Sequence, residues 1–236
     1  MNPIEIVAWA ALTKEARPLA QPLVDVAARL LWRLLGRPAS AAADRLAAML
    51  APPTPTEPSV ADAVALWKSG NVVGVLAKAT EIFEREGVAP IELPREFLVP
   101  TLEAAAYAAD DDVRVFFAQL LVSGTREARH RHPMIVNILR ELAGEDAREF
   151  VAACARADEF GIPFGPASHR PFWAEEFSED VHVRLDVLRL IERYSEPPTT
   201  TPDEGSRAPD QRPERAIVPS EFGWRFRLAV CPPRAQ

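Results

Sequence analysis

Two histidines near the middle of the chain are the first side chains whose chemistry could include metal binding or proton transfer. His130 and His132 open the stretch RHRHPMIVNILRELAGEDAREFVAAC. A helical metal pair needs ligands three or four residues apart, whereas these two are two apart and no third ligand of suitable spacing lies near. Pro133 follows, and proline favours the first position of a helix. The sequence therefore predicts a helix entry here, with no catalytic residue and no metal site.

Three consecutive aspartates, Asp110 to Asp112, are the second candidate for chemistry, because carboxylates bind divalent cations. Adjacent aspartates that open a helix do not converge on one ion. They do favour a helix N-terminus, through capping and the helix dipole. We predict that they cap a helix whose apolar stripe begins at Val113.

The densest positive patch follows that helix and contains Arg126, Arg129, His130, Arg131 and His132. Cations near a helix C-terminus interact favourably with the dipole, and we expect a helix to end at Gly124. A solvated helix cap is our main interpretation. A site for an anionic ligand is the alternative.

The composition is that of an ordinary globular protein that can bury a core. Of 236 residues, 48% are hydrophobic and 26% are charged. The formal net charge of -7 argues against a protein whose main role is to grip nucleic-acid backbone. No phosphate-binding loop, dinucleotide fingerprint, nucleophile elbow or zinc-protease motif is present. We therefore predict neither an enzyme nor a bound cofactor.

Apolar residues recur at helical spacing along most of the chain, and glycine or proline follows most of the runs. The predicted helices are 23–35, 72–87, 94–109, 113–124, 133–143, 145–158 and 180–194. Pro100 lies inside the third of these and predicts a kink or a two-piece helix. The chain closes with an extended piece at 216–219, a turn and a last helix.

The predicted fold class is all-α, a helical bundle with amphipathic N-terminal helices and a C-terminal helix-turn-helix or winged-helix-like unit. We expect an N-terminal arm with a proline-rich linker at 1–59, a central bundle at 60–128 and a C-terminal region at 129–236. The segment FGIPFGPASHRPFW should be irregular. The loop 195–215 has no apolar period and should be disordered.

The order of several motifs resembles the Abi-alpha (abortive infection alpha) family of bacteria. A proline-led helix, an acidic turn, an HPxxVxILxxLxxxDA-like motif and an FGxxF-like motif carry this resemblance. It covers Leu66 to Ala157 and, more weakly, Ile217 to Val230. The matching positions, which we interpret as structural, are Pro94, Phe97, Pro100, Glu103, His132, Pro133, Asp146, Phe222, Gly223 and Phe226.

This resemblance implies a cytoplasmic or membrane-peripheral protein linked to phage resistance, and it supplies no catalytic residues. Our first hypothesis is a non-enzymatic antiviral effector or interaction module in the cytoplasm, with a protein or phage component as its partner. Neither the oligomeric state nor the mechanism follows from the sequence.

Two alternatives stay open. In the first, the predicted helix 180–194 binds nucleic acid through Arg184, Arg189 and Arg193, although acidic residues in the same helix oppose this. We favour protein contacts for a winged-helix-like unit. In the second, the amphipathic N-terminal helices make peripheral contact with a membrane, with Trp32, Arg29 and Arg33 at the lipid interface.

Overall fold

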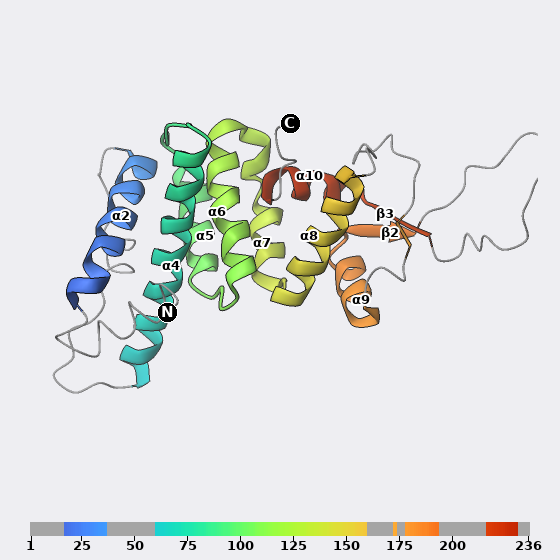
Figure 1. Cartoon of the computed structure of the whole chain (residues 1–236), viewed down its shortest axis with the longest axis horizontal. Coiled ribbons are helices and arrows are strands. Elements are labelled where there is room, and N and C mark those ends of the chain that lie inside the picture. The colour runs from blue at the N-terminus through green and yellow to red at the C-terminus, as the bar shows by residue number, and fades with distance from the viewer. Residues whose placement is uncertain (1–16, 37–59, 160–171, 174–177, 194–215, 231–236) are drawn as a thin grey trace, which may run out of the picture. The chain divides into compact units, whose positions relative to one another are not determined.

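The computed structural model describes residues 17–36, 60–159, 172–173, 178–193 and 216–230. The chain forms two compact units, residues 1–144 and 145–236. The described parts are mostly helical (Figure 1), which confirms the predicted fold class at this level. The predicted three-part division stays a prediction. Its proline-rich linker and the predicted loop 195–215 lie outside the described residues.

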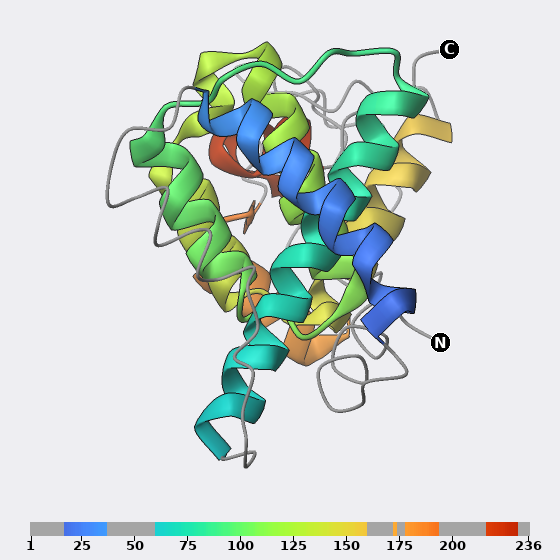
Figure 2. The ribbon, with the colours of Figure 1, turned by 90° about the vertical axis from the view of Figure 1, so that its left-hand side faces the viewer.

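Helix α4 (Val60–Arg85) is the centre of the first unit. The run from Ser69 to Ala77 is buried on every side, as expected for a helix that packs against neighbours all round. Helix α6 (Asp111–Arg126) packs along it, and α2 (Arg17–Leu35) lies across it (Figure 2). The predicted helix 72–87 is thus the second half of a longer one.

Helices α5 (Arg95–Ala105) and α7 (Pro133–Glu141) complete this unit, with a short 3₁₀ helix η1 (Ala128–Arg131) between α6 and α7. The backbone N–H of Leu93 donates to the carbonyl of Leu34 at 2.8 Å, which fastens the segment before α5 to the end of α2. The two-piece alternative is wrong, because α5 is one helix through Pro100. Pro100 and Glu96, whose carbonyl loses a helical donor, are both exposed, so water can replace the missing bond.

The second unit contains α8, which begins at Gly144 (Gly144–Glu159), α9 (Glu179–Val187), α10 (Glu221–Val230) and a small antiparallel sheet. Its strands are β1 (Phe172–Trp173), β2 (Ile191–Arg193) and β3 (Ala216–Pro219), in the order β1-β3-β2. Ile217 pairs with Phe172 on one side and Arg193 on the other. The predicted extended piece and last helix are confirmed, whereas Phe172 and Trp173, predicted to be irregular, form β1.

The predicted helix 180–194 is wrong in its second half. Helix α9 ends at Val187, and Arg189 has a left-handed backbone with φ 56°. This conformation reverses the chain direction, so the next residues form β2. Leu190 and Ile191 continue the apolar pattern of α9 because both are buried, not because they are helical.

Two glycines have roles other than the predicted helix ends. Gly124 lies inside α6, which continues to Arg126. Gly144 begins α8, whereas α7 has already ended at Glu141. A Cβ atom at Gly144 would overlap the carboxylate of Asp110. A side chain here would therefore displace the capping carboxylate of Asp110, so glycine at this position favours close packing rather than a turn.

Candidate functional site

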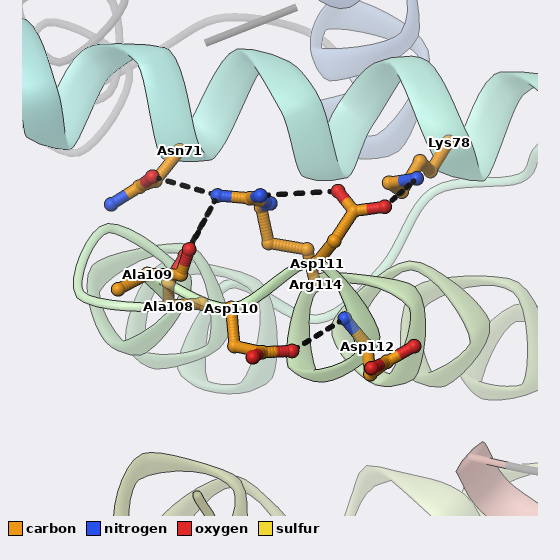
Figure 3. Close-up of polar contacts among 8 residues, drawn as sticks. All are labelled: Asn71, Lys78, Ala108, Ala109, Asp110, Asp111, Asp112 and Arg114. Atoms are coloured by element: carbon orange, nitrogen blue, oxygen red, sulfur yellow. Dashed lines mark hydrogen bonds and ion pairs between the residues drawn. The ribbon is translucent and has the colours of Figure 1, made fainter. Parts of the chain in front are cut away.

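The aspartates at the start of α6 have two different roles. Asp110 is the N-cap, and its Oδ1 accepts a hydrogen bond from the N–H of Asp112 at 2.9 Å. This confirms the predicted capping. Asp111 turns instead toward α4, where its two oxygens accept hydrogen bonds from Lys78 at 3.0 Å and Arg114 at 3.1 Å (Figure 3).

Arg114 is a buried cation that joins the start of α6 to α4 (Figure 3). Only 3% of its side chain is exposed. One terminal nitrogen donates to Asn71 Oδ1 at 3.2 Å and to the carbonyls of Ala108 at 3.2 Å and Ala109 at 3.1 Å. The other donates to Asp111. Four acceptors, from α4, from α6 and from the loop between α5 and α6, therefore surround one guanidinium group.

Asn71 completes this network from inside α4. It is fully buried, and its Nδ2 donates to the carbonyl of Ala106 at 2.8 Å. Sequence reasoning missed both Asn71 and Arg114. The available signal was a polar side chain inside an otherwise apolar run, because such a residue is buried only with partners. The partners of this network are all protein groups, so it fixes the α4–α6 packing rather than offering an open reactive group.

Asp111 is held in its ionised form. Burial would raise the pKa of its carboxyl, but the hydrogen bonds and charges of Lys78 and Arg114 outweigh this and lower the pKa. The stabilisation from this pairing is therefore complete above the unfolded pKa of about 4 and is lost as the pH falls through the lower folded value. A carboxylate of this kind is a charge partner, not a proton donor near neutral pH.

The histidine pair does not form one site. His132 is exposed and caps α7, its Nδ1 accepting from the N–H of Met134 at 3.2 Å, and Pro133 is the first helical residue. This confirms the predicted helix entry. His130 lies in η1 and is buried. Among the described residues, no group of three or more His, Cys, Asp or Glu side chains could hold a metal ion.

The arginines of the basic patch already have partners within the protein. Arg131 Nε donates to the carbonyl of Gly124 at 2.7 Å, near the end of α6. Ion pairs join the other two arginines to carboxylates, Arg126 to Glu86 and Arg129 to Glu127. These contacts favour the helix-cap interpretation over an anion site.

His130 differs from the other ionisable side chains of this turn because it is buried. It is 6% exposed, and neither ring nitrogen has a hydrogen-bond partner among the described residues. The nearest carboxylate oxygen belongs to Glu127, 3.9 Å from Nε2. Burial lowers the pKa of His130, Glu127 raises it in part, and Arg129 lowers it further. The imidazole is therefore neutral at physiological pH.

We expect acid to destabilise this turn through His130. At pH values above about 6.5 the imidazole is neutral in both the folded and the unfolded chain. As the pH falls, the unfolded chain binds the proton first, so the free energy of unfolding decreases. His130→Leu should flatten the pH dependence of urea unfolding between about pH 7 and 5. Parallel curves for wild type and His130→Leu would contradict this role.

An ion pair in the second unit links α9 to the start of α8. Asp146 is completely buried, and Arg184 Nε donates to its Oδ1 at 2.6 Å. Arg184 also donates to Glu145 at 3.3 Å. The hydrogen bond to Asp146 is the main cause of a raised pKa for Arg184. The Asp146 position thus pairs with a cation that lies 38 residues further along the chain.

The three arginines predicted to contact nucleic acid are not on one helix. Arg184 is in α9, Arg189 is exposed in the turn that follows, and Arg193 is in β2. Arg184 already binds two carboxylates. The predicted placement of all three arginines on one recognition helix is therefore wrong. Nucleic-acid binding itself stays a prediction.

Gly223 allows α10 to approach the turn between α9 and β2. A Cβ atom at this position would overlap the backbone carbonyl oxygen of Leu190. Ser220 lies between the two elements, its N–H donating to the Leu190 carbonyl at 3.2 Å and its Oγ accepting from the N–H of Gly223 at 2.8 Å. One turn later, Phe226 packs edge-on against Phe150 of α8, with ring centroids 5.6 Å apart.

Residues 72–164 match the sequence profile of the family described as abortive infection alpha. Over these residues the chain is similar to the Abi-alpha family. Searches among curated proteins and among solved structures gave no match. The Abi-alpha region includes Arg114, the helix entry at His132 and the buried Asp146. The partner of Asp146, Arg184, and the glycine of the last helix lie outside it.

Most of the predicted Abi-alpha motif positions are at caps or in packed contacts. Pro94 is the N-cap of α5, and Phe97 is buried. Phe222 and Glu103 are half-buried, whereas Pro100 is exposed. The remaining positions are those already described: His132, Pro133, Asp146, Gly223 and Phe226.

The apolar face of α2 is used within the protein. Leu30 and Leu31 are 5% and 2% exposed, whereas Trp32 is 43% exposed. Among the described helices, α4 is long and apolar enough to cross a membrane by length and composition, but 56% of its most apolar window is buried. Packing therefore accounts for the buried apolar residues of both helices, and peripheral membrane contact stays a prediction.

Proposed function

We propose that this chain is a bacterial anti-phage protein of the abortive-infection type that acts in the cytoplasm without an active site. The match of residues 72–164 to the Abi-alpha family carries the link to abortive infection. The closed polar networks support the absence of an active site. The best-formed of them, around Arg114, uses its donors on protein acceptors rather than presenting them to a substrate.

The first turns of α4 are the surface best suited to contact a protein partner. They extend beyond α5 and α6 (Figure 2). Val60 is 83% exposed, Val64 45% and Trp67 37%. Trp67 packs edge-on against Tyr107, whose hydroxyl accepts a hydrogen bond from Lys68 at 2.7 Å. Exposed apolar and aromatic side chains that are held in place are typical of interface anchors.

The partner we propose is an apolar surface of a phage or host protein. Asp62 is the only charged residue between Val60 and Trp67, so charge attraction contributes little to this surface. Binding would then depend on burial of the valine and tryptophan side chains. A polar or charged substitution there should weaken binding more than the loss of any surface ion pair.

A plaque assay tests this proposal in cells whose expression of the protein reduces phage plating. Val64→Glu combined with Trp67→Glu should restore plating to the level of cells without the protein. Val115→Glu combined with Met134→Glu is the matched control, because those side chains are 38% and 39% exposed in the same unit. Circular dichroism should show both variants folded. Full protection by the first variant would reject this surface.

We further propose that the second unit is winged-helix-like. The order α8, β1, α9, β2, β3 and the sheet order β1-β3-β2 support it, because such units end in a hairpin whose last strand is central. We propose that it makes protein contacts, since Arg184 binds carboxylates of its own chain.

Nucleic-acid binding by this unit is the alternative, and Arg189, exposed beside the hairpin, favours it. A gel-shift series at falling salt concentration separates the two, because phosphate contacts strengthen as salt is removed. We expect no shift at low salt. A shift that weakens in Arg189→Gln would favour the nucleic-acid alternative instead.

A further inference from the structure

A half-open pocket of about 470 Å³ lies between α2, the second half of α4 and the segment 87–90. Its volume is within the range of small-molecule sites. The apolar part of its lining includes Leu30 and Phe83, which are 5% and 3% exposed, and Val26. The network around Arg114 and the exposed turns at the start of α4 do not contribute to it.

Charged side chains line the same pocket. Arg29 and Arg33 are exposed and four residues apart on α2, so they project from one face of that helix. Arg29 uses only its Nε, donating to the carbonyl of Asp25 at 3.3 Å. Glu84 lines the pocket from α4. Within the described part of the chain, neither Arg33 nor Glu84 has an ion-pair partner.

Two guanidinium groups beside an apolar surface suit a ligand that has an anionic head and a hydrocarbon chain. Arginine binds carboxylates through parallel N–H donors, and the half-buried Val26, Val88 and Pro90 offer a surface to a hydrocarbon. We infer that this pocket binds a single-chain amphiphile with an anionic carboxylate head, the chemistry of a fatty acid. The carboxylate lies against Arg29 and Arg33, and the hydrocarbon chain lies along Val26, Val88 and Pro90. This inference does not rest on the proposed anti-phage function.

Calorimetric titration of the full chain with decanoate, below its micelle concentration, tests the inference. Decanoate should bind with one molecule per chain, and decanol, which lacks the charge, should bind at least about tenfold more weakly. Arg29→Gln combined with Arg33→Gln should raise the dissociation constant by about tenfold or more. Arg129→Gln combined with Arg140→Gln removes two positive charges outside the pocket and should change nothing.

Two further variants separate pocket binding from general adsorption. Ala89 is an exposed residue of the lining, so Ala89→Trp should fill the pocket without disturbing the core and should abolish binding. Glu84→Gln removes the one negative charge of the rim and should tighten decanoate binding. No heat of binding, equal binding by wild type and Ala89→Trp, or weaker binding by Glu84→Gln would each overturn the inference.

Discussion

Replacing Arg114 with leucine should lower the free energy of unfolding of the first unit by about 3 kcal/mol, because three acceptors each lose a donor at a cost of about 1 kcal/mol or more. The substitution leaves the side-chain oxygen of Asn71 and the carbonyls of Ala108 and Ala109 without the donor they now share. Each buried acceptor that loses its partner retains the cost of its desolvation. Urea denaturation followed by circular dichroism measures the loss.

Lys78→Leu is the matched control for this prediction. Lys78 contacts the same carboxylate, but Asp111 is 57% exposed there. An exposed ion pair contributes at most about 1 kcal/mol, so the control should change stability little. Combining Arg114→Leu with Asn71→Leu should cost less than the sum of the two single variants, because the second removes an orphaned acceptor. Equal effects of Arg114→Leu and Lys78→Leu would show that the buried network does not stabilise the fold.

Gly223→Ala should destabilise the second unit by about 3 kcal/mol, the upper end of the cost of overpacking. The added methyl group would meet the backbone carbonyl of Leu190, which cannot rotate away as a side chain can. The helix α10 must then move, and the hydrogen bonds that Ser220 makes to both sides are strained. Hydrogen exchange should detect faster opening of the α10 and β2 amides.

Gly124→Ala is the control, since Gly124 also lies within a helix. A Cβ atom there would be 3.0 Å from Cε1 of the Phe97 ring, and a ring can shift by a few tenths of an ångström. Alanine also improves helix propensity by about 1 kcal/mol, which offsets part of the contact. We expect little net change in stability. If Gly223→Ala were equally mild, the close approach of α10 to Leu190 would not be a requirement of the fold.

Local patterns were sufficient to predict most helices and their first residues. The entry at His132 and Pro133 and the cap at Asp110 depend on neighbours two or three residues away, and both are confirmed. Helix ends were less predictable. The apolar spacing through Leu190 and Ile191 continues that of α9, although the left-handed Arg189 has already ended the helix. Two buried positions satisfy a helical period whether or not the backbone is helical.

The candidate sites depended on residues far apart in the chain. Nothing local distinguishes buried His130 from exposed His132, or Arg114 from the arginines of the surface. Arg114 meets an acceptor 43 residues away, and Arg184 meets a carboxylate 38 residues away. The pocket beside Arg29 likewise requires α2 to lie across α4.

The sequence by itself determined the helical class, the main caps and the resemblance to Abi-alpha, because short-range periodicity and capping chemistry act within one element. Only the tertiary structure decided which polar groups are buried, which of them are paired and where a cavity remains. Desolvation and pairing are set by the neighbours that folding brings together, and those neighbours come from other elements.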